Sequence, residues 1–180
     1  NLVILVLDKS GSMTGNPIKK AKESIFKLIQ SLHASHQFML VAYAGYHKNF
    51  STYYDQSIGA ENYRTTNGAK DVQFYDYRNK DINFIEKSIQ SIKCGGTTSF
   101  QVAFDCIRNN LSTVKNKPIG HIIFFTDGTD TDTASPEDIM IALDLLTTEV
   151  EAVMTHPQIH CLGFSKEHDA KFLGDLTTKL

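Results

Sequence analysis

The chain has 180 residues, of which 41% are hydrophobic and 21% charged, and its formal net charge is -2. This composition is typical of one globular domain with a sizeable core, and it argues against a disordered chain. The small negative charge without a basic stripe argues against nucleic acid or an anionic membrane as partner. No apolar run approaches the ~20 residues of a membrane span.

The three cysteines bear on the compartment in which the protein works. Cys94, Cys106 and Cys161 are odd in number and widely spaced, which argues against a disulfide framework or a zinc site. Cys106 and Cys161 fall in apolar segments, where small buried thiols are common. This use of cysteine favours a cytoplasmic location, with an extracellular location as the alternative.

The chain begins with an apolar run, residues 2–7, that shows no polar alternation. Such a run predicts a strand buried on both faces in the middle of a parallel sheet. The next residues, Asp8-Lys9-Ser10-Gly11-Ser12, place three oxygen-bearing side chains at alternate positions of one loop. Open α/β sheets bind ligands at the carboxyl ends of their strands. Because hard oxygen donors suit Mg²⁺ or Mn²⁺ rather than zinc or copper, this loop predicts a metal site.

Strands and helices are expected to alternate along most of the remaining chain. Apolar residues spaced by three and four predict helices over residues 16–32, 82–92, 100–111, 135–153 and 172–176. Apolar runs predict strands over residues 38–44, 119–125 and 159–164. We therefore expect an α/β fold of Rossmann-like, doubly wound type: a mostly parallel sheet with one antiparallel edge strand and helices on both faces, in three α/β/α layers.

Residues 50–81 depart from this alternation. Residues 50–54 are typical of a short strand that returns antiparallel at an edge. Residues 55–81 are polar and rich in tyrosine, with no clear period, and are expected to form an irregular insertion. We favour a small β-hairpin around Asn67-Gly68. The alternative is a partner-binding surface, since exposed tyrosines suit interfaces, with the candidates Tyr63, Tyr75 and Tyr77.

Two further motifs complete a known pattern. Gly95-Gly96-Thr97 follows a predicted helix, and Thr126-Asp127-Gly128 follows the apolar run at residues 122–125. Together with Asp8-x-Ser10-x-Ser12, they resemble the metal-ion-dependent adhesion site of von Willebrand factor A domains. Each motif alone matches by chance, whereas three in this order and structural context are specific.

The resemblance implies a ligand set and a function. Its metal-binding residues would be Asp8, Ser10, Ser12, Thr97 and Asp127, and the cofactor Mg²⁺ or Mn²⁺. A site with few direct carboxylates leaves a divalent ion under-neutralised, so the ion keeps affinity for an outside anion. The implied function is a non-catalytic interaction module that docks an acidic side chain of a protein partner.

The resemblance covers residues 1–180 as a single domain. The family normally continues, after the region around Leu176, with a last edge strand and a C-terminal helix, and we expect both to be absent from this sequence. The family also crosses the region of residues 55–81 with fewer residues. Neither the resemblance nor the composition predicts an oligomeric state.

Two other functions are weighed against the interaction module. A Mg²⁺-dependent hydrolase or phosphotransfer domain could use Asp8 as its nucleophile, but Ser10 stands where the second, proton-donating aspartate would be needed, and serine shuttles that proton poorly at neutral pH. A scaffold with a silent metal site is the other alternative. The acidic residues Asp130 and Asp132, which follow Asp127, predict a solvated loop near the site.

Overall fold

The computed structural model describes residues 1–32, 36–45, 61–64, 71–78, 80–128, 130–131, 135–164 and 170–180, with residues 61–64, 71, 73 and 74 described by their backbone alone. The centre of the fold is a six-stranded sheet in the order β3-β4-β2-β1-β5-β6. Its strands are β1 (Leu2–Asp8), β2 (Gln37–Ala44), β3 (Glu61–Arg64), β4 (Asp71–Asp76), β5 (Ile119–Thr126) and β6 (Thr155–Gly163).

The directions of the strands confirm the predicted mixed sheet. β1 pairs in parallel with β2 and β5, and β5 pairs in parallel with β6. β4 runs antiparallel to β2 on one side and to β3 on the other. The antiparallel strand therefore lies one position in from the edge, which β3 occupies. β3 and β4 flank Asn67-Gly68, but that turn and the strand expected over residues 50–54 lie outside the described residues.

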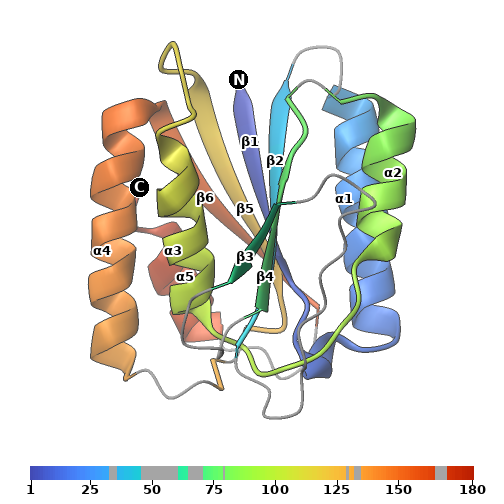
Figure 1. Cartoon of the computed structure of the whole chain (residues 1–180). Helices are drawn as coiled ribbons and strands as arrows, with labels where there is room; N and C mark the ends of the chain where they lie inside the picture. Colours follow the sequence, from blue (N-terminus) through green and yellow to red (C-terminus); the bar gives the residue numbers. More distant parts are fainter. Residues whose placement is uncertain are drawn as a thin grey trace.

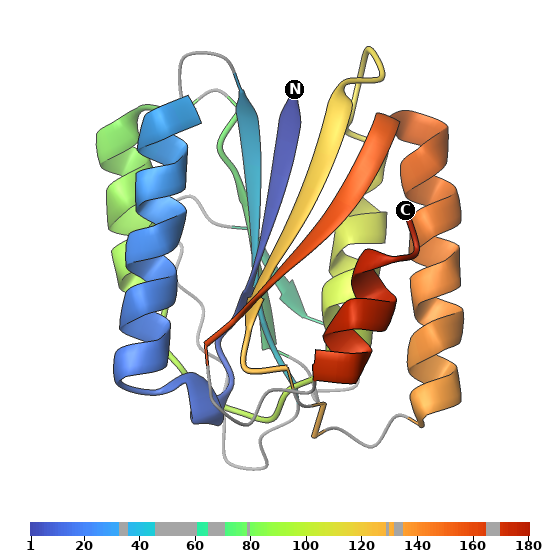
Figure 2. The same cartoon turned by 180° about the vertical axis from the view of Figure 1, so that it is seen from behind.

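Helices cover both faces of the sheet, as the alternation predicted (Figures 1 and 2). One face carries α1 (Asn16–Leu32) and α2 (Ile82–Ser91). The other carries α3 (Phe100–Leu111), α4 (Pro136–Val153) and α5 (Ala170–Thr177). Among these helices, none combines the length and hydropathy that crossing a bilayer requires.

Strand β1 divides the core into two halves. Leu2, Ile4 and Val6 pack toward α3, α4 and α5, whereas Val3, Leu5 and Leu7 pack toward α1 and α2. Because both faces of β1 are buried, its sequence shows no polar alternation. Strand β6 is different, because most of its side chains are exposed or half-buried. The strand predicted from the apolar run at residues 159–164 therefore covers only the second half of β6, which begins at Thr155.

Local capping sets where two of the helices begin. The Ser135 hydroxyl accepts a hydrogen bond from the Asp138 amide at 3.1 Å, and the Asp138 carboxylate accepts one from the Ser135 amide at 3.3 Å. This reciprocal pair, with Pro136 in the first turn, starts α4. Asp81 caps α2 by accepting a hydrogen bond of 2.8 Å from the Phe84 amide.

Candidate metal centre

The candidate site lies at the carboxyl ends of β1 and β5, at the lower end of the sheet in Figure 1. Asp8 is the last residue of β1, and Asp127 directly follows β5. In the sheet, β1 lies between β2 and β5. After β1 the chain continues into α1 on one face of the sheet, and after β5 it continues into α4 on the opposite face. The two strand ends thus form a topological switch point, where ligands of open α/β sheets bind.

Backbone hydrogen bonds join the loop after β1 to the loop before α3. The Gly11 amide donates to the Gly96 carbonyl at 2.9 Å, and the Gly95 amide donates to the Lys9 carbonyl at 2.8 Å. Because Gly96 has a φ of +82° and lies against the Gly45 carbonyl, a side chain there would be strained and crowded. The two glycines of this motif therefore hold their loop against the Asp8 loop, while the carbonyl and hydroxyl of the next residue, Thr97, lie against Gly45.

Asp8 is held by hydrogen bonds to both of its carboxylate oxygens. Oδ1 accepts from the Ser10 amide at 2.9 Å, and Oδ2 accepts from the Thr126 hydroxyl at 2.8 Å. The Thr126 hydroxyl itself accepts from the Gly128 amide at 2.9 Å. Asp8 is fully buried, so this network fixes its carboxylate at the junction of the two loops.

The electrostatics of this junction favour a bound cation. Burial raises the pKa of Asp8 to about 6; the hydrogen bonds from Ser10 and Thr126 oppose the rise, and the negative charge of Asp127 adds to it. The carboxylates of Asp8 and Asp127 therefore repel each other at a poorly hydrated site. A cation between them would offset the cost of burying their charge.

The oxygen atoms at the junction fit a hard divalent cation. Asp127 is 8% exposed, and its buried Oδ1 has no hydrogen-bond partner among the described residues. The Ser10 and Ser12 hydroxyl oxygens lie 3.0 Å apart, with Ser10 buried and Ser12 exposed. Orphaned buried carboxylate oxygens are rare in native proteins unless an ion or water satisfies them. In the described part of the chain, no three histidine, cysteine or acidic side chains come together as a metal site, and the candidate site itself contains two carboxylates, so its other donors would be hydroxyl oxygens.

Comparison with known families decides what kind of domain carries this junction. The family model for the von Willebrand factor type A domain matches residues 3–179. The chain belongs to the von Willebrand factor type A (VWA) family. The predicted family and fold class are therefore confirmed, whereas the metal site remains a prediction.

Solved structures similar to this VWA domain share its fold at low sequence identity. A von Willebrand factor type A protein from Catenulispora acidiphila superposes with a TM-score of 0.69 at 19% identity, over 100% of this chain and 37% of that one. The pilus adhesin SpaC from Lactobacillus rhamnosus GG gives a TM-score of 0.56 at 13% identity, over 99% of this chain and 26% of that one. These likenesses concern the fold alone.

A curated relative is mouse inter alpha-trypsin inhibitor, heavy chain 4. It is 26% identical over 178 residues, which cover 95% of the VWA domain described here. The chain spans only 16% of the length of that relative. The activity and partners of the whole relative therefore do not transfer to this domain.

Two residues that organise the VWA site were not predicted as functional. Thr126 orients Asp8 through its hydroxyl. Its position at a strand end, directly before Asp127, was the one sequence feature that could have indicated this role. Asp130 caps α3 by accepting a hydrogen bond of 2.9 Å from the Phe100 amide. This cap has no local sequence signal, because it comes from a loop 30 residues away, in which Asp130 is half-buried and Thr131 is exposed. Asp132 lies outside the described residues.

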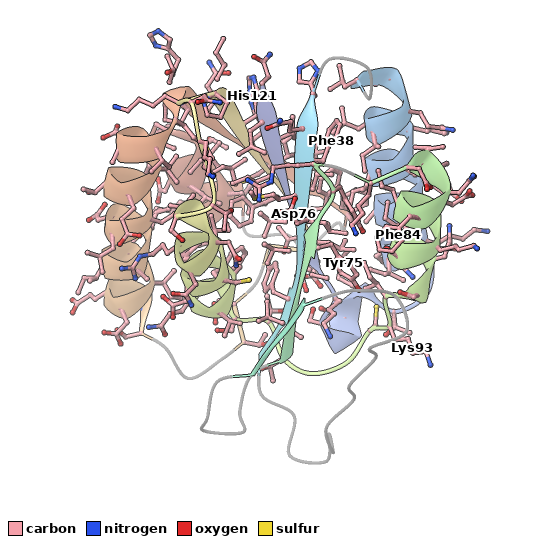
Figure 3. The ribbon with its side chains drawn as sticks, turned by 45° about the horizontal axis from the view of Figure 1, so that its top comes forward. Phe38, Tyr75, Asp76, Phe84, Lys93 and His121 are labelled. Atoms are coloured by element: carbon pink, nitrogen blue, oxygen red, sulfur yellow. The ribbon has the colours of Figure 1, made fainter. Side chains whose placement is uncertain are left out.

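The tyrosines considered as a partner surface are placed differently. Tyr75 and Tyr77 are only 2% and 3% exposed, and their rings stack with centroids 5.8 Å apart. Both pack on the side of the sheet covered by α1 and α2, where Figure 3 labels Tyr75. They are core residues, so the proposed partner surface is wrong for these two; the side chain of Tyr63 lies outside the description.

Proposed function

We propose that this VWA domain is a non-catalytic interaction module that holds Mg²⁺ and docks an acidic side chain of a protein partner. The observation that carries the proposal is the buried Oδ1 of Asp127, which has no partner among the described residues, beside the buried carboxylate of Asp8. Domains of this family are typically interaction or adhesion modules.

The residues present suggest a division of roles. Ser10, Ser12 and Thr97 would offer neutral hydroxyl oxygens, while Asp8 and Asp127 would supply the negative charge. The bound ion supplies a Lewis-acidic docking point for a carboxylate oxygen. Thr126, by donating to Asp8 Oδ2, keeps the second oxygen of that carboxylate fixed while the other faces the Ser10 amide.

The comparisons also bear on where the domain works. Proteins of similar fold include pilus adhesins, and we propose an extracellular or cell-surface location on that basis. The cytoplasmic location predicted from cysteine use finds no support among these relatives. The half-buried Cys94 and Cys161 and the buried Cys106 are all free thiols.

Metal binding is tested by thermal unfolding and by calorimetric titration with Mn²⁺ and Mg²⁺. Ligands that bind only the folded state raise the unfolding temperature in step with their saturation. We expect a rise with either ion that chelator removes and that Asp127→Asn abolishes. Glu137→Gln, an acid-to-amide change on the exposed start of α4, is the matched control and should respond as the wild type does.

Docking of an acid is tested with acetate as the probe. Acetate should tighten Mn²⁺ binding by the wild-type domain, because the carboxylate and the ion stabilise each other in one complex. Metal binding without any effect of acetate would support the ion and contradict the docking. A flat titration with both ions would contradict the whole proposal and leave a scaffold.

A further inference from the structure

Helix α4 carries an apolar surface on the side that faces away from the sheet. Its inward residues, which are buried, are Ile139, Ala142, Leu143, Leu146, Thr147 and Val150. Ile141 and Leu145, one turn apart on the outer side, are 60% and 47% exposed. Only four large hydrophobic side chains are exposed among the described residues, and two of them are this pair. Figure 2 shows α4 as the outermost element on its side of the molecule.

The exposed residues of α4 repeat with the spacing of a helix–helix contact. Ile141, Leu145, Thr148 and Ala152 are all exposed and follow one another at intervals of four, three and four. We call these residues the α4 seam. A repeat that alternates three and four places side chains in a line that a second helix can follow. The seam is roughly 17 Å long, at 1.5 Å per residue.

The charge of α4 indicates which kind of helix fits. The helix contains five acidic residues and no lysine or arginine: Glu137, Asp138, Asp144, Glu149 and Glu151. Asp144 pairs with Lys179 at 2.7 Å and Glu149 pairs with Arg108 at 2.6 Å, so basic side chains of the same chain offset these two charges. The other three acidic residues keep the surface of α4 negatively charged. Glu151, next to Ala152, is exposed and makes no ion pair with any described residue.

The acidic residues of α4 argue against a second copy of this chain as the molecule that covers the α4 seam. In a symmetric dimer the α4 helices of two copies would face each other, which brings acidic flanks together. Like charges at the flanks of a helix pair disfavour that pairing. A partner helix with lysine or arginine at its flanks has the complementary charge.

We propose that the α4 seam docks an amphipathic helix of a partner protein, with apolar side chains in its own seam and basic side chains at its flanks. Ile141 and Leu145 would supply the apolar contact, and Glu151 would pair with a flanking basic residue. This surface does not involve the candidate metal residues. The proposal therefore stands or fails independently of metal binding.

The test uses a designed helical peptide with leucine at the a and d positions and lysine at e and g. Addition to the ¹⁵N-labelled domain should shift the amide signals of residues 141–152. Ile141→Gln and Leu145→Gln should each weaken binding about tenfold. Glutamine is a good helix former, so these exposed positions should keep the fold, which circular dichroism verifies. Leu162→Gln, at a leucine of β6 that is 46% exposed, is the matched control.

Charge is tested separately from apolar contact. Glu151→Lys should weaken binding of the lysine peptide, and a peptide with glutamate at e and g should not bind. Equal binding of both peptides, or binding unchanged in the Leu145→Gln variant, would overturn the proposal. Analytical ultracentrifugation provides a further test. A wild-type dimer that is lost in Leu145→Gln would also overturn the proposal, because a second copy of this chain would then cover the α4 seam.

Discussion

The Thr126 hydroxyl donates a hydrogen bond of 2.8 Å to Asp8 Oδ2, across 118 residues of sequence. The bond joins the last residues of the adjacent strands β5 and β1. It is buried, and it leaves Asp8 Oδ1 to the Ser10 amide. One threonine thus couples the pairing of two strands to the orientation of a candidate metal ligand.

Thr126→Val should weaken both the fold and the metal site. Valine keeps the shape of threonine but cannot donate to Asp8, and losing a hydrogen bond to a buried charged group costs about 2 kcal/mol. We expect a lower free energy of unfolding in urea and weaker Mn²⁺ binding by calorimetry. Thr126→Ser, which keeps a hydroxyl, should retain most of both. Unchanged Mn²⁺ affinity in the valine variant would show that Asp8 is positioned without Thr126.

The stability of the metal-free domain should fall as pH rises from about 4 to about 6. Burial raises the pKa of Asp8 from 3.8 to about 6, so the folded state holds a proton that the unfolded state has released across this window. The stabilisation is fully present below pH 3.8 and is lost as pH passes about 6. The change corresponds to about 3 kcal/mol.

This pH dependence is measured by urea unfolding in the presence of chelator, as the difference between the wild type and Asp8→Asn. The asparagine variant lacks the titrating group, so the difference isolates Asp8 from other carboxylates. Saturating Mg²⁺ should reduce or reverse the slope, because a cation favours the ionised carboxylate. If the difference in unfolding free energy between the wild type and Asp8→Asn does not vary between pH 4 and 6, the raised pKa of Asp8 is contradicted.

Gly45→Ala should disturb Thr97. A methyl group at Gly45 would overlap the Thr97 hydroxyl oxygen, and the Gly45 amide already donates to the Thr97 carbonyl at 2.5 Å. We expect a loss of about 1–3 kcal/mol in unfolding free energy, as for other overpacked sites, together with weaker Mn²⁺ binding. Gly174→Ala is the control: nothing lies within 4 Å of its added methyl group. Because Gly174 is inside α5, that change should stabilise the domain slightly.

Asp130→Ala should loosen the start of α3. Asp130 accepts from the Phe100 amide, and the helix has no side-chain cap from Ser99 itself. Loss of a cap costs about 1 kcal/mol. Asp130→Asn, which keeps an acceptor oxygen, should recover most of it. Thermal unfolding measures the loss, and equal destabilisation by both variants would point to the charge of Asp130 rather than to capping.

Much of the fold could be predicted from local patterns. The unbroken apolar run of β1 indicated burial on both faces, and the burial of all seven of its residues agrees. The helices predicted to begin at residues 16 and 135 begin at Asn16 and Pro136, because proline, serine and asparagine have backbone preferences at helix starts that act within a few residues. The candidate metal residues were predicted because three short motifs, each directly beside a predicted strand or helix, resemble the adhesion site of the family.

Other features depend on elements far apart in the sequence. Tyr75 and Tyr77 lie in a polar stretch, yet both are buried in the core between the sheet and helices α1 and α2. The cap of α3 by Asp130 and the exposed seam of α4 likewise follow from which elements pack together.

The sequence by itself determined the succession of strands and helices and the three loop motifs, because propensity, periodicity and turn chemistry act between near neighbours. Only the tertiary structure decided that β1 lies between β2 and β5, and that Asp8 meets Thr126 while Asp127 Oδ1 is left buried without a partner among the described residues. Strand order and burial are set by packing over the whole core, where distant segments compete for the same neighbours.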